Sequence, residues 1–504
     1  MKNLLFTLIT FSSGLCFGQA IDTLEGTISY NRNLCADTIY ILKKGVFIDN
    51  GYTLTIDPGT IIKGTEGTDS DASYLVISRG AKILANGTPA QPIIFTTVLD
   101  DITNTDPDYP AFNNLTATDD GLWGGVIILG NAKISYAGGS EISLEGLPIE
   151  NPNRFYGGDD NSDNSGVFEY VSIRHGGIHI GEGNEVNALT LGAIGSGTVI
   201  NHIETIACQD DGIELSGGAV NLNDVISVEA GDDAIDTHLG YSGTIDNFIV
   251  INPDDEGLEL DGPNGDYTAE HTLINGTVKV TEADGLIDLD NDTWVNVSNV
   301  YFFDLESGQD LNLVPDDAAS TFSNLETTIP DGESIADYFL DGSDAAVTNV
   351  ELGAQTVGAN ICEFTTWTCT DLAGLLTATF VVNPIGCNDP TSSNYCPYAP
   401  SSTDCRYDLI YDCAGFTNIE EPEIQLAKVN VYPNPADEQF ILEIVSDQFL
   451  NSTYSIYDVL GKKMSEGQVL QTTKTIDVSN WERGIYLLKI SAGDQVVTVK
   501  VVMK

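Results

Sequence analysis

The stretch Asp210-Asp211-Gly212-Ile213-Glu214 is the first of four similar rows that decide the fold. It is followed by Asp232-Asp233-Ala234-Ile235-Asp236, then Asp255-Glu256-Gly257-Leu258-Glu259, and then Asp284-Gly285-Leu286-Ile287-Asp288. The steps from Ile213 to Ile235, to Leu258 and to Ile287 are 22, 23 and 29 residues. The same steps align Ile203 with Val225 and Phe248, so apolar and acidic residues recur in separate columns.

A period in the low twenties, with alternating β-branched residues and Gly, Asn and Asp at the row ends, is typical of a β-solenoid. Each row would be one coil whose inward side chains stack on those of the next coil. A leucine-rich repeat has rows of similar length, but it needs Leu at fixed positions and a helical segment in each row. We therefore predict an all-β chain whose residues 21–370 form a right-handed parallel β-helix with caps.

Stacking has an electrostatic consequence for the acidic columns. Coils about 4.8 Å apart would bring carboxylates of successive rows together in outward ladders, which must be solvated, protonated or bridged by a hard cation such as calcium. The alternative is that these are ordinary turn residues that bond to their own backbone. The candidate calcium ligands are Asp210, Asp211, Glu214, Asp232, Asp233, Asp236, Asp255, Glu256, Glu259, Asp284 and Asp288.

Enzyme chemistry is the second possibility, because parallel β-helices also host polysaccharide lyases and hydrolases. Gly231-Asp232-Asp233 resembles a short motif of polygalacturonase-type hydrolases, which need a carboxylate pair about 6.5–9.5 Å apart for inversion. His202 and His238 occupy different places in adjacent rows, so they need not converge. A uronate lyase is disfavoured, because Arg174 is the only Lys or Arg between Phe155 and Val278. The candidate catalytic residues are Asp210, Asp211, Asp232, Asp233, Glu214 and His202.

The composition excludes several partners. The net charge is -55 and the pI is about 4.1, so nucleic acid and anionic membrane surfaces would be repelled. The hydrophobic content of 42% indicates that this charge belongs to a folded surface and not to a disordered chain.

The first 18 residues read as a secretory signal, with Lys2 before an apolar run and small residues before the expected cleavage point after Gly18. Lipidation at Cys16 is an alternative, although Leu15 stands where a lipoprotein signal has a small residue. No later apolar run approaches the roughly 20 residues of a membrane span. We expect an exported chain.

The sequence from Asn33 onward resembles a large family of exported β-helix proteins of Bacteroidetes. The resemblance rests on segments 34–64, 74–97, 121–130, 170–177 and 210–214, and it covers most of residues 33–370. It implies the β-helix fold and no established activity.

Two less regular segments, 100–121 and 135–165, interrupt the repeats. Insertions in solenoids gather on one side and often form the binding face. The aromatic residues that border them are Trp123, Tyr136, Phe155 and Tyr156. An aromatic side chain beside carboxylates would suit sugar binding, whereas Trp123 within its apolar segment is equally well explained as core.

Six cysteines lie between Cys362 and Cys413, and their clustering in an exported chain predicts disulfides. Cys362 and Cys369 are close enough in sequence to pair at the end of the solenoid cap. Cys35 and Cys208 are expected to be buried thiols. Residues 371–416 resemble a short Cys-rich module of exported Bacteroidetes proteins. That resemblance leads us to pair Cys387 with Cys405, and the extra Cys396 with Cys413. A zinc site is the alternative, but the module has no histidine.

Residues 417–428 read as a linker before a specific C-terminal segment, 429–504. Its motifs are Val431-Tyr432-Pro433-Asn434-Pro435, Tyr457-Asp458-Val459-Leu460-Gly461 and Gly484-Ile485-Tyr486-Leu487. They closely resemble the type A C-terminal sorting domain of the type IX secretion system, a small β-sandwich. The resemblance implies export to the outer-membrane surface or the medium, with the secretion machinery and surface lipopolysaccharide as partners. An immunoglobulin-like binding domain is the alternative.

Taken together, the sequence predicts an exported, monomeric β-helix protein that binds extracellular glycan or another surface with the help of calcium. The alternative is a glycoside hydrolase that uses the stacked acidic residues.

Overall fold

The computed structural model describes residues 19–380 and 429–503, apart from short gaps. The gaps are 69–70, 107–108, 145–146, 148–150, 180–184, 282–284, 290–291, 306–309, 313–319, 331, 340–342, 378–379, 433–438, 445–451, 459–461, 470, 479–480, 482–483 and 493–494. The chain divides into two units, Met1–Leu409 and Ile410–Lys504. The predicted signal peptide, the linker, Asp284 and the cysteines of the 387–413 region lie outside the described residues.

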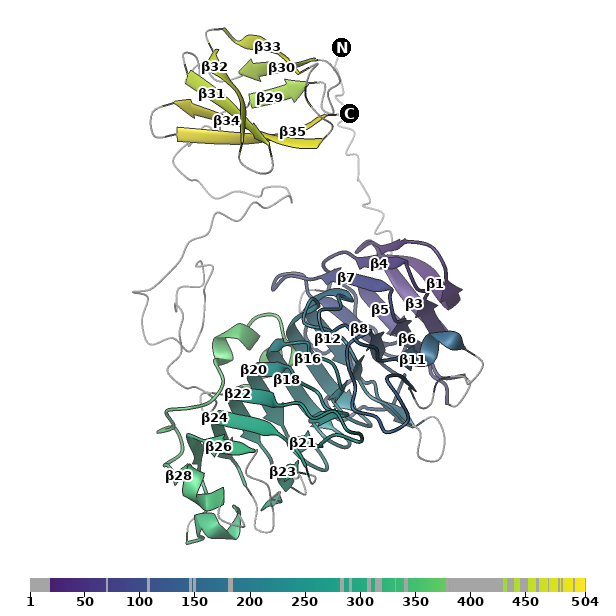
Figure 1. Cartoon of the computed structure of the whole chain (residues 1–504), viewed down its shortest axis with the longest axis vertical. Coiled ribbons are helices and arrows are strands. Elements are labelled where there is room, and N and C mark those ends of the chain that lie inside the picture. The colour runs from purple at the N-terminus through teal and green to yellow at the C-terminus, as the bar shows by residue number, and fades with distance from the viewer. Residues whose placement is uncertain are drawn as a thin grey trace, which may run out of the picture. The chain divides into compact units, whose positions relative to one another are not determined.

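The first unit is a three-sided parallel β-helix, in which each coil contributes strands that pair with the coils before and after it (Figure 1). The first coils contain β1 (Ala20–Ile28), β2 (Arg32–Leu34), β3 (Thr38–Ile48), β4 (Thr53–Ile56), β5 (Ile61–Gly64), β6 (Tyr74–Ile77), β7 (Lys82–Asn86) and β8 (Ile93–Thr97).

In the later coils, two of the three sides come from long strands that bend in the middle. These are β12 (Gly166–Arg174), β16 (Val199–Cys208), β18 (Leu222–Ala230), β20 (Thr244–Ile251), β22 (His271–Lys279) and β24 (Val295–Phe303). The last coils end in β26 (Thr321–Ser323), β27 (Leu325–Thr327) and β28 (Val347–Asn349).

The third side carries the acidic columns of the sequence repeat, and we call it the acidic face. It consists of β9 (Val126–Leu129), β15 (Leu189–Gly192), β17 (Ile213–Ser216), β19 (Ile235–His238), β21 (Glu259–Leu260), β23 (Gly285–Leu289) and β25 (Asp310–Asn312). All its pairings are parallel.

The interior of the coils is the apolar column that the sequence repeat predicts. Ile213 and Ile235 pair in register, and together with Leu258 and Ile287 they are fully buried in one core. On another side, Ile203 pairs with Val225, and Val225 with Phe248. The predicted parallel β-helix is therefore confirmed, because side chains that recur at one position of the coil bury each other.

The long strands bend at residues in the left-handed backbone conformation, and these residues stack in a bend column. Its members are Tyr170, His202, Asp224, Asn247, Asn275, Asn299 and Asn324, with φ between 50° and 62°. Asn tolerates this conformation better than most residues. The side-chain Nδ2 of Asn299 donates to Oδ1 of Asn275 (3.0 Å), and Nδ2 of Asn324 donates to Oδ1 of Asn299 (2.6 Å).

The two insertions cover different sides, contrary to the prediction that they gather on one. Ile102 of the first insertion packs on Ile61 and Ile94. The second insertion lies over the acidic face, where Leu144 and Tyr156 line a pocket. It contains β10 (Ile142–Ser143), η2 (Pro152–Arg154) and β11 (Phe155–Tyr156), and a hairpin of β13 (Ile178–His179) and β14 (Glu185–Val186) follows.

Residues 357–376, which we call the strap, run back over the bent strands instead of ending the solenoid. Val357, Ile361, Phe364 and Trp367 bury apolar side chains of β16, β18 and β20, including Ile226. The strap contains η5 (Ile361–Phe364) and α1 (Cys369–Leu372). Before it, η3 (Ile335–Asp337) and η4 (Ser343–Ala346) lie between β27 and β28, and Phe339 packs edge-on against Phe302.

The cysteine predictions for the β-helix need correction. Cys369 is buried and carries a free thiol, so its predicted pairing with Cys362 is wrong. Cys369 is the first residue of α1 and points into the core, whereas Cys362 belongs to η5, is partly exposed and is itself disulfide-bonded. Cys208 is a buried free thiol as predicted, but Cys35 is exposed because it follows β2 in a turn.

The second unit consists of two antiparallel sheets that share one hydrophobic core, which includes Phe440, Ile456 and Leu488. One sheet contains β29 (Val429–Tyr432), β30 (Gln439–Ile444) and β33 (Thr473–Asp477). The other contains β31 (Ser452–Asp458), β32 (Lys463–Val469), β34 (Gly484–Ala492) and β35 (Gln495–Met503).

One histidine of the β-helix core gives a pH prediction. His271 is 3% exposed, its Nε2 lies 3.1 Å from Oγ1 of Thr237, and burial lowers its pKa to about 3. In the unfolded chain this histidine takes up a proton below about pH 6.5, whereas in the folded chain it stays neutral. The free energy of unfolding therefore falls as the pH drops below that value, by about 1.4 kcal/mol per pH unit.

We expect His271→Gln to remove this part of the acid destabilisation between pH 6.5 and pH 5. Denaturant titrations of both proteins at the two pH values measure it. An equal loss of stability in variant and wild type would contradict the prediction.

Candidate functional site

A pocket of about 350 Å³ opens where the second insertion covers the acidic face. Its floor comes from β17, β19 and β21 and the turns before them, and its wall comes from Tyr136, residues 142–144 and Tyr156. The lining residues are Tyr136, Ile142, Ser143, Leu144, Tyr156, Asn187, Asp210, Asp211, Glu214, Asp232, His238, Leu239, Glu259 and Asn264. Five of them carry a carboxyl group, and none of these described lining residues is lysine or arginine.

The first acidic column of the sequence is a ladder on the acidic face. Glu214 pairs in register with Asp236, Asp236 with Glu259, and Glu259 with Asp288. These side chains point away from the coil interior, but the insertion covers part of the ladder. Asp236 is only 9% exposed, and its Oδ1 atom has no hydrogen-bond partner among the described residues.

A second acidic column stabilises the turn that precedes the face. Oδ1 of Asn187 accepts the backbone N–H of Asp211 (3.2 Å), Oδ1 of Asp211 accepts that of Asp233 (3.1 Å), and Oδ1 of Asp233 accepts that of Glu256 (2.8 Å). Asp211 and Asp233 therefore hold the turn of the next coil, whereas the turn-residue interpretation expected bonds to their own backbone. Oxygens of Asp210, Asp211 and Asp232 also lie within 4.8 Å of one another beside the pocket.

Glu214 and His238 form the one ion pair that the structure describes inside the pocket. His238 Nε2 lies 2.8 Å from Oε1 of Glu214, and the other oxygen of Glu214 accepts from Nδ2 of Asn187 (2.6 Å). Burial by itself would raise the pKa of Glu214, but the hydrogen bond and charge of His238 lower it. Burial would lower the pKa of His238, and the bond to Glu214 raises it instead.

Burial raises the pKa of three neighbouring acids, Asp211, Asp233 and Asp236. Burial, and then the charges of Asp236 and Asp210, raise the pKa of Asp211 well above its ordinary value. Burial and the charges of Glu214 and Glu259 do the same to the pKa of Asp236. Burial and a hydrogen bond to Glu259 raise the pKa of Asp233 to about 12. A cation would compete with protons for these acids, because carboxylates without a counter-ion are costly to ionise where water is excluded.

Comparison with known families agrees with this architecture. Residues 26–369 match the model of the pectate-lyase-like β-helix domain. The chain belongs to this β-helix family. Residues 430–504 match the secretion-system C-terminal sorting domain. The sorting domain makes the type IX secretion machinery a partner of this pectate-lyase-like β-helix, indicates a Bacteroidetes origin, and directs the protein to the outer-membrane surface or the extracellular space.

Two solved structures show weak similarity to this pectate-lyase-like β-helix protein. One is the enzymatically active domain of tailspike protein 2 from bacteriophage CBA120, at 10% identity and a TM-score of 0.20, with 92% of this chain and 72% of that chain covered. The other is full-length tailspike protein 2 from an Escherichia coli O157:H7 bacteriophage, at 9% identity and 0.18, with coverages of 92% and 59%. No curated protein matches the chain. None of the described helices is long and apolar enough to cross a membrane.

The structure places the predicted site residues of this β-helix in three groups. Asp210, Asp211, Glu214, Asp232 and Glu259 line the pocket, and Asp236 lies directly beside Glu214. Asp233, Asp255, Glu256 and Asp288 belong to the same columns but not to the pocket lining, and Asp284 lies outside the described residues. His202 is on the bend column and does not line the pocket, so the structure does not bring it together with the other catalytic candidates.

Two residues of the pocket, His238 and Asn187, are not among the site residues predicted from the sequence. His238 follows Asp236 by two positions in β19, and the two-residue period of a strand puts both on the outward side. Asn187 aligns with Asp211 one coil earlier, but its row lacks the acidic signature. Of the aromatic candidates, Tyr136 and Tyr156 line the pocket, whereas Trp123 is fully buried and donates from Nε1 to the carbonyl of Arg174.

Proposed function

We propose that this protein is displayed on the cell surface, or released from it, and binds an extracellular neutral glycan in the acidic pocket with a calcium ion. The observation that carries the proposal is the excess of carboxyl groups in the covered pocket, which faces a single histidine. The sorting domain supports the location, and attachment to surface lipopolysaccharide is part of the same proposal.

The chemistry of the donors supports calcium. Calcium takes six to eight oxygen ligands from carboxylates and carbonyls in flexible geometry. Asp210, Asp211 and Asp232 bring oxygens within 4.8 Å of one another, and the unpartnered Oδ1 of Asp236 lies on the same covered face. Calcium would neutralise this cluster, which includes Asp211, whose pKa burial raises.

The shape and lining of the pocket support a sugar. A volume of about 350 Å³ is at the lower end of the roughly 300–1,000 Å³ of ligand pockets. Tyr136 and Tyr156 offer aromatic surface, and carboxylates accept hydrogen bonds from sugar hydroxyls. A uronic acid polymer would be repelled, because Arg174 is fully buried away from the pocket and donates to Ser172.

A glycoside hydrolase is the second candidate, and one observation favours it. Glu214 has a lowered pKa and Asp236 a raised one, and paired carboxyl groups whose pKa values diverge are typical of a base and an acid. Their oxygens lie within 4.8 Å of each other. That separation is closer to the roughly 5–5.5 Å of retaining enzymes than to the spacing of inverting ones, so an inverting polygalacturonase-like pair is disfavoured.

One experiment separates the two candidates. The mature full-length chain is passed over immobilised neutral and uronic polysaccharides in calcium and in chelator, and the eluates are assayed for new reducing ends. We expect calcium-dependent retention on a neutral polymer without cleavage. Retention should be lost in Asp232→Asn and kept in Asp304→Asn, an acid of 50% side-chain exposure outside the pocket.

Two results would count against the binding proposal. New reducing ends that disappear in Glu214→Gln would make the protein a hydrolase. No retention on any polymer, with or without calcium, would reject a glycan ligand for the pocket.

A further inference from the structure

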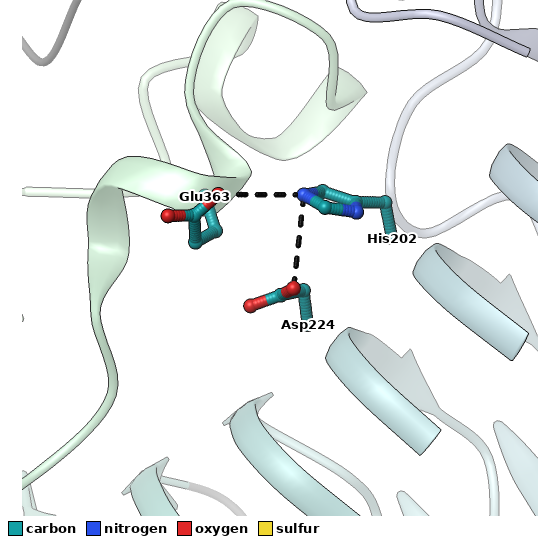
Figure 2. Close-up of side chains that lie close together, drawn as sticks. All are labelled: His202, Asp224 and Glu363. Carbon is teal, nitrogen blue, oxygen red and sulfur yellow. Dashed lines mark hydrogen bonds and ion pairs between the residues drawn. The ribbon is translucent and has the colours of Figure 1, made fainter. Parts of the chain in front are cut away.

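A second cluster of potential ligands lies on the bend column, away from the acidic pocket. Figure 2 shows His202 of β16 and Asp224 of β18 turned toward Glu363, which comes from η5 of the strap. Nε2 of His202 is 3.7 Å from Oδ2 of Asp224 and 3.4 Å from Oε2 of Glu363. These three donor atoms all lie within 4.8 Å of one another.

His202 and Asp224, like Tyr170 one coil before them, differ from the asparagines of the later bend column. The four following positions are Asn247, Asn275, Asn299 and Asn324, and asparagine suits the left-handed conformation. Histidine and aspartate occur instead in the two coils that face Glu363. A structural role in the bend alone would be met by asparagine, so the change points to a role that needs an imidazole and a carboxylate.

The distance from Nε2 of His202 to Oε2 of Glu363 fits two ligands of one metal ion. Hydrogen bonds from N–H to oxygen usually measure about 2.7–3.2 Å. The 3.4 Å contact with Glu363 is a long hydrogen bond, and the 3.7 Å contact with Asp224 is an ion-pair distance. Zinc binds nitrogen and oxygen at about 2.0–2.1 Å in tetrahedral sites, which places neighbouring ligand atoms roughly 3.3–3.4 Å apart. His202 is 7% exposed, and its Nδ1 has no partner among the described residues. A cation on Nε2 would give this buried ring a strong polar contact.

Neighbouring side chains hold both carboxylates in a suitable orientation. Nδ2 of Asn247 donates to Oδ1 of Asp224, and Nδ2 of Asn360 donates to Oε1 of Glu363 (3.2 Å). The other oxygen of each carboxylate is thereby left facing His202. Tyr170 stacks on the imidazole with a centroid distance of 4.1 Å. Such outer contacts are what orient metal ligands in proteins.

We propose that His202, Asp224 and Glu363 bind a divalent transition-metal ion of the zinc class and that this ion fastens the strap to the coils. Imidazole among the ligands favours zinc over calcium or magnesium. The side chain of Glu363 is 45% exposed, which gives the ion an entry path and leaves room for a water molecule as a further ligand. The site is independent of the glycan pocket.

The test is zinc binding to the mature full-length chain after chelation and dialysis. Calorimetric titration with Zn²⁺ and elemental analysis give the affinity and the stoichiometry. We expect one equivalent to be bound at this site, with Ca²⁺ unable to displace it, and Co²⁺ in its place to give the visible absorption bands of a four-coordinate ion. Glu363→Gln alters a partly exposed residue, and His202→Asn introduces the residue of the following coils, so both variants should fold.

Each variant should weaken zinc binding at the site by at least roughly 10-fold, whereas His238→Asn in the acidic pocket should leave it unchanged. Absence of zinc binding by the wild-type chain would overturn the proposal. So would unchanged binding in both Glu363→Gln and His202→Asn, or a loss confined to His238→Asn, which would assign the zinc to the pocket. None of these results bears on calcium-dependent glycan retention.

Discussion

Replacing Glu204 by alanine is expected to lower the free energy of unfolding of the β-helix by about 3–5 kcal/mol, the usual cost of removing one partner of a buried charged network. Glu204 is fully buried. Its Oε1 accepts the backbone N–H of Thr370 (2.8 Å), and its Oε2 accepts that of Cys369 (3.0 Å). Ser172 links it to the guanidinium of Arg174, which is also fully buried.

The loss of stability is large because alanine would leave buried polar groups without a partner. The first N–H groups of α1 would lose their acceptor, and Arg174 would lose the carboxylate to which Ser172 links it. Urea denaturation followed by the fluorescence of Trp367, which is buried in the strap, measures the loss. Glu204→Gln should lose less, because an amide oxygen still accepts, and Glu25→Ala, with an exposed side chain, should leave the midpoint unchanged. A loss below about 1 kcal/mol in Glu204→Ala would show that the strap does not depend on this carboxylate.

The coils were predictable from sequence because their contacts repeat. In a solenoid the neighbour of a residue lies one period away, so aligning Ile213 with Ile235 also aligns Glu214 with Asp236. The acidic ladder therefore follows from the same spacing as the core. Its burial does not, because that depends on the insertion that covers it.

The positions of the insertions and the strap were not predictable in this way. The first insertion leaves the coil between β8 and β9, and the second leaves between β9 and β12, so they start at different corners and cover different sides. The strap contacts residues far earlier in the chain, as in the bond from Thr370 to Glu204. No repeat relates these segments to the coils. A hydrophobic residue such as Trp367 indicates burial, but its identity does not indicate which surface it packs against.

The cluster of His202, Asp224 and Glu363 also combines residues that the repeat relates with one residue that it does not. That His202 and Asp224 share one bend column follows from the repeat of 22 residues. Glu363 joins them only because the strap returns to these coils, so a row-by-row comparison finds two ligands and misses the third. The sequence also placed His202 among the catalytic candidates with the acids. In the structure His202 lies at the bend of the long strands, whereas the acids lie on the acidic face.

The other large expected effect is a gain in stability from Asp233→Asn in chelator at alkaline pH. Asp233 is 4% exposed, it accepts the backbone N–H of Glu256, and as a protonated acid it donates to Glu259. Asparagine reproduces both contacts without a proton to lose. Because burial raises the pKa of Asp233 to about 12, the folded chain keeps a proton that the unfolded chain releases near pH 4.

The sign follows from proton linkage. Above pH 4 the folded state binds more protons than the unfolded state at this residue, so wild-type stability falls as the pH rises, by about 1.4 kcal/mol per pH unit. Between pH 5 and pH 8 the advantage of Asp233→Asn should therefore grow by an amount on the order of 4 kcal/mol. Denaturant titrations at both pH values measure it. Asp71→Asn is the control, since Lys44 lowers the pKa of Asp71 and that group is ionised in both states throughout this range. An advantage that does not grow with pH would mean that Asp233 is ionised in the folded protein and that the second acidic column carries this charge without a retained proton.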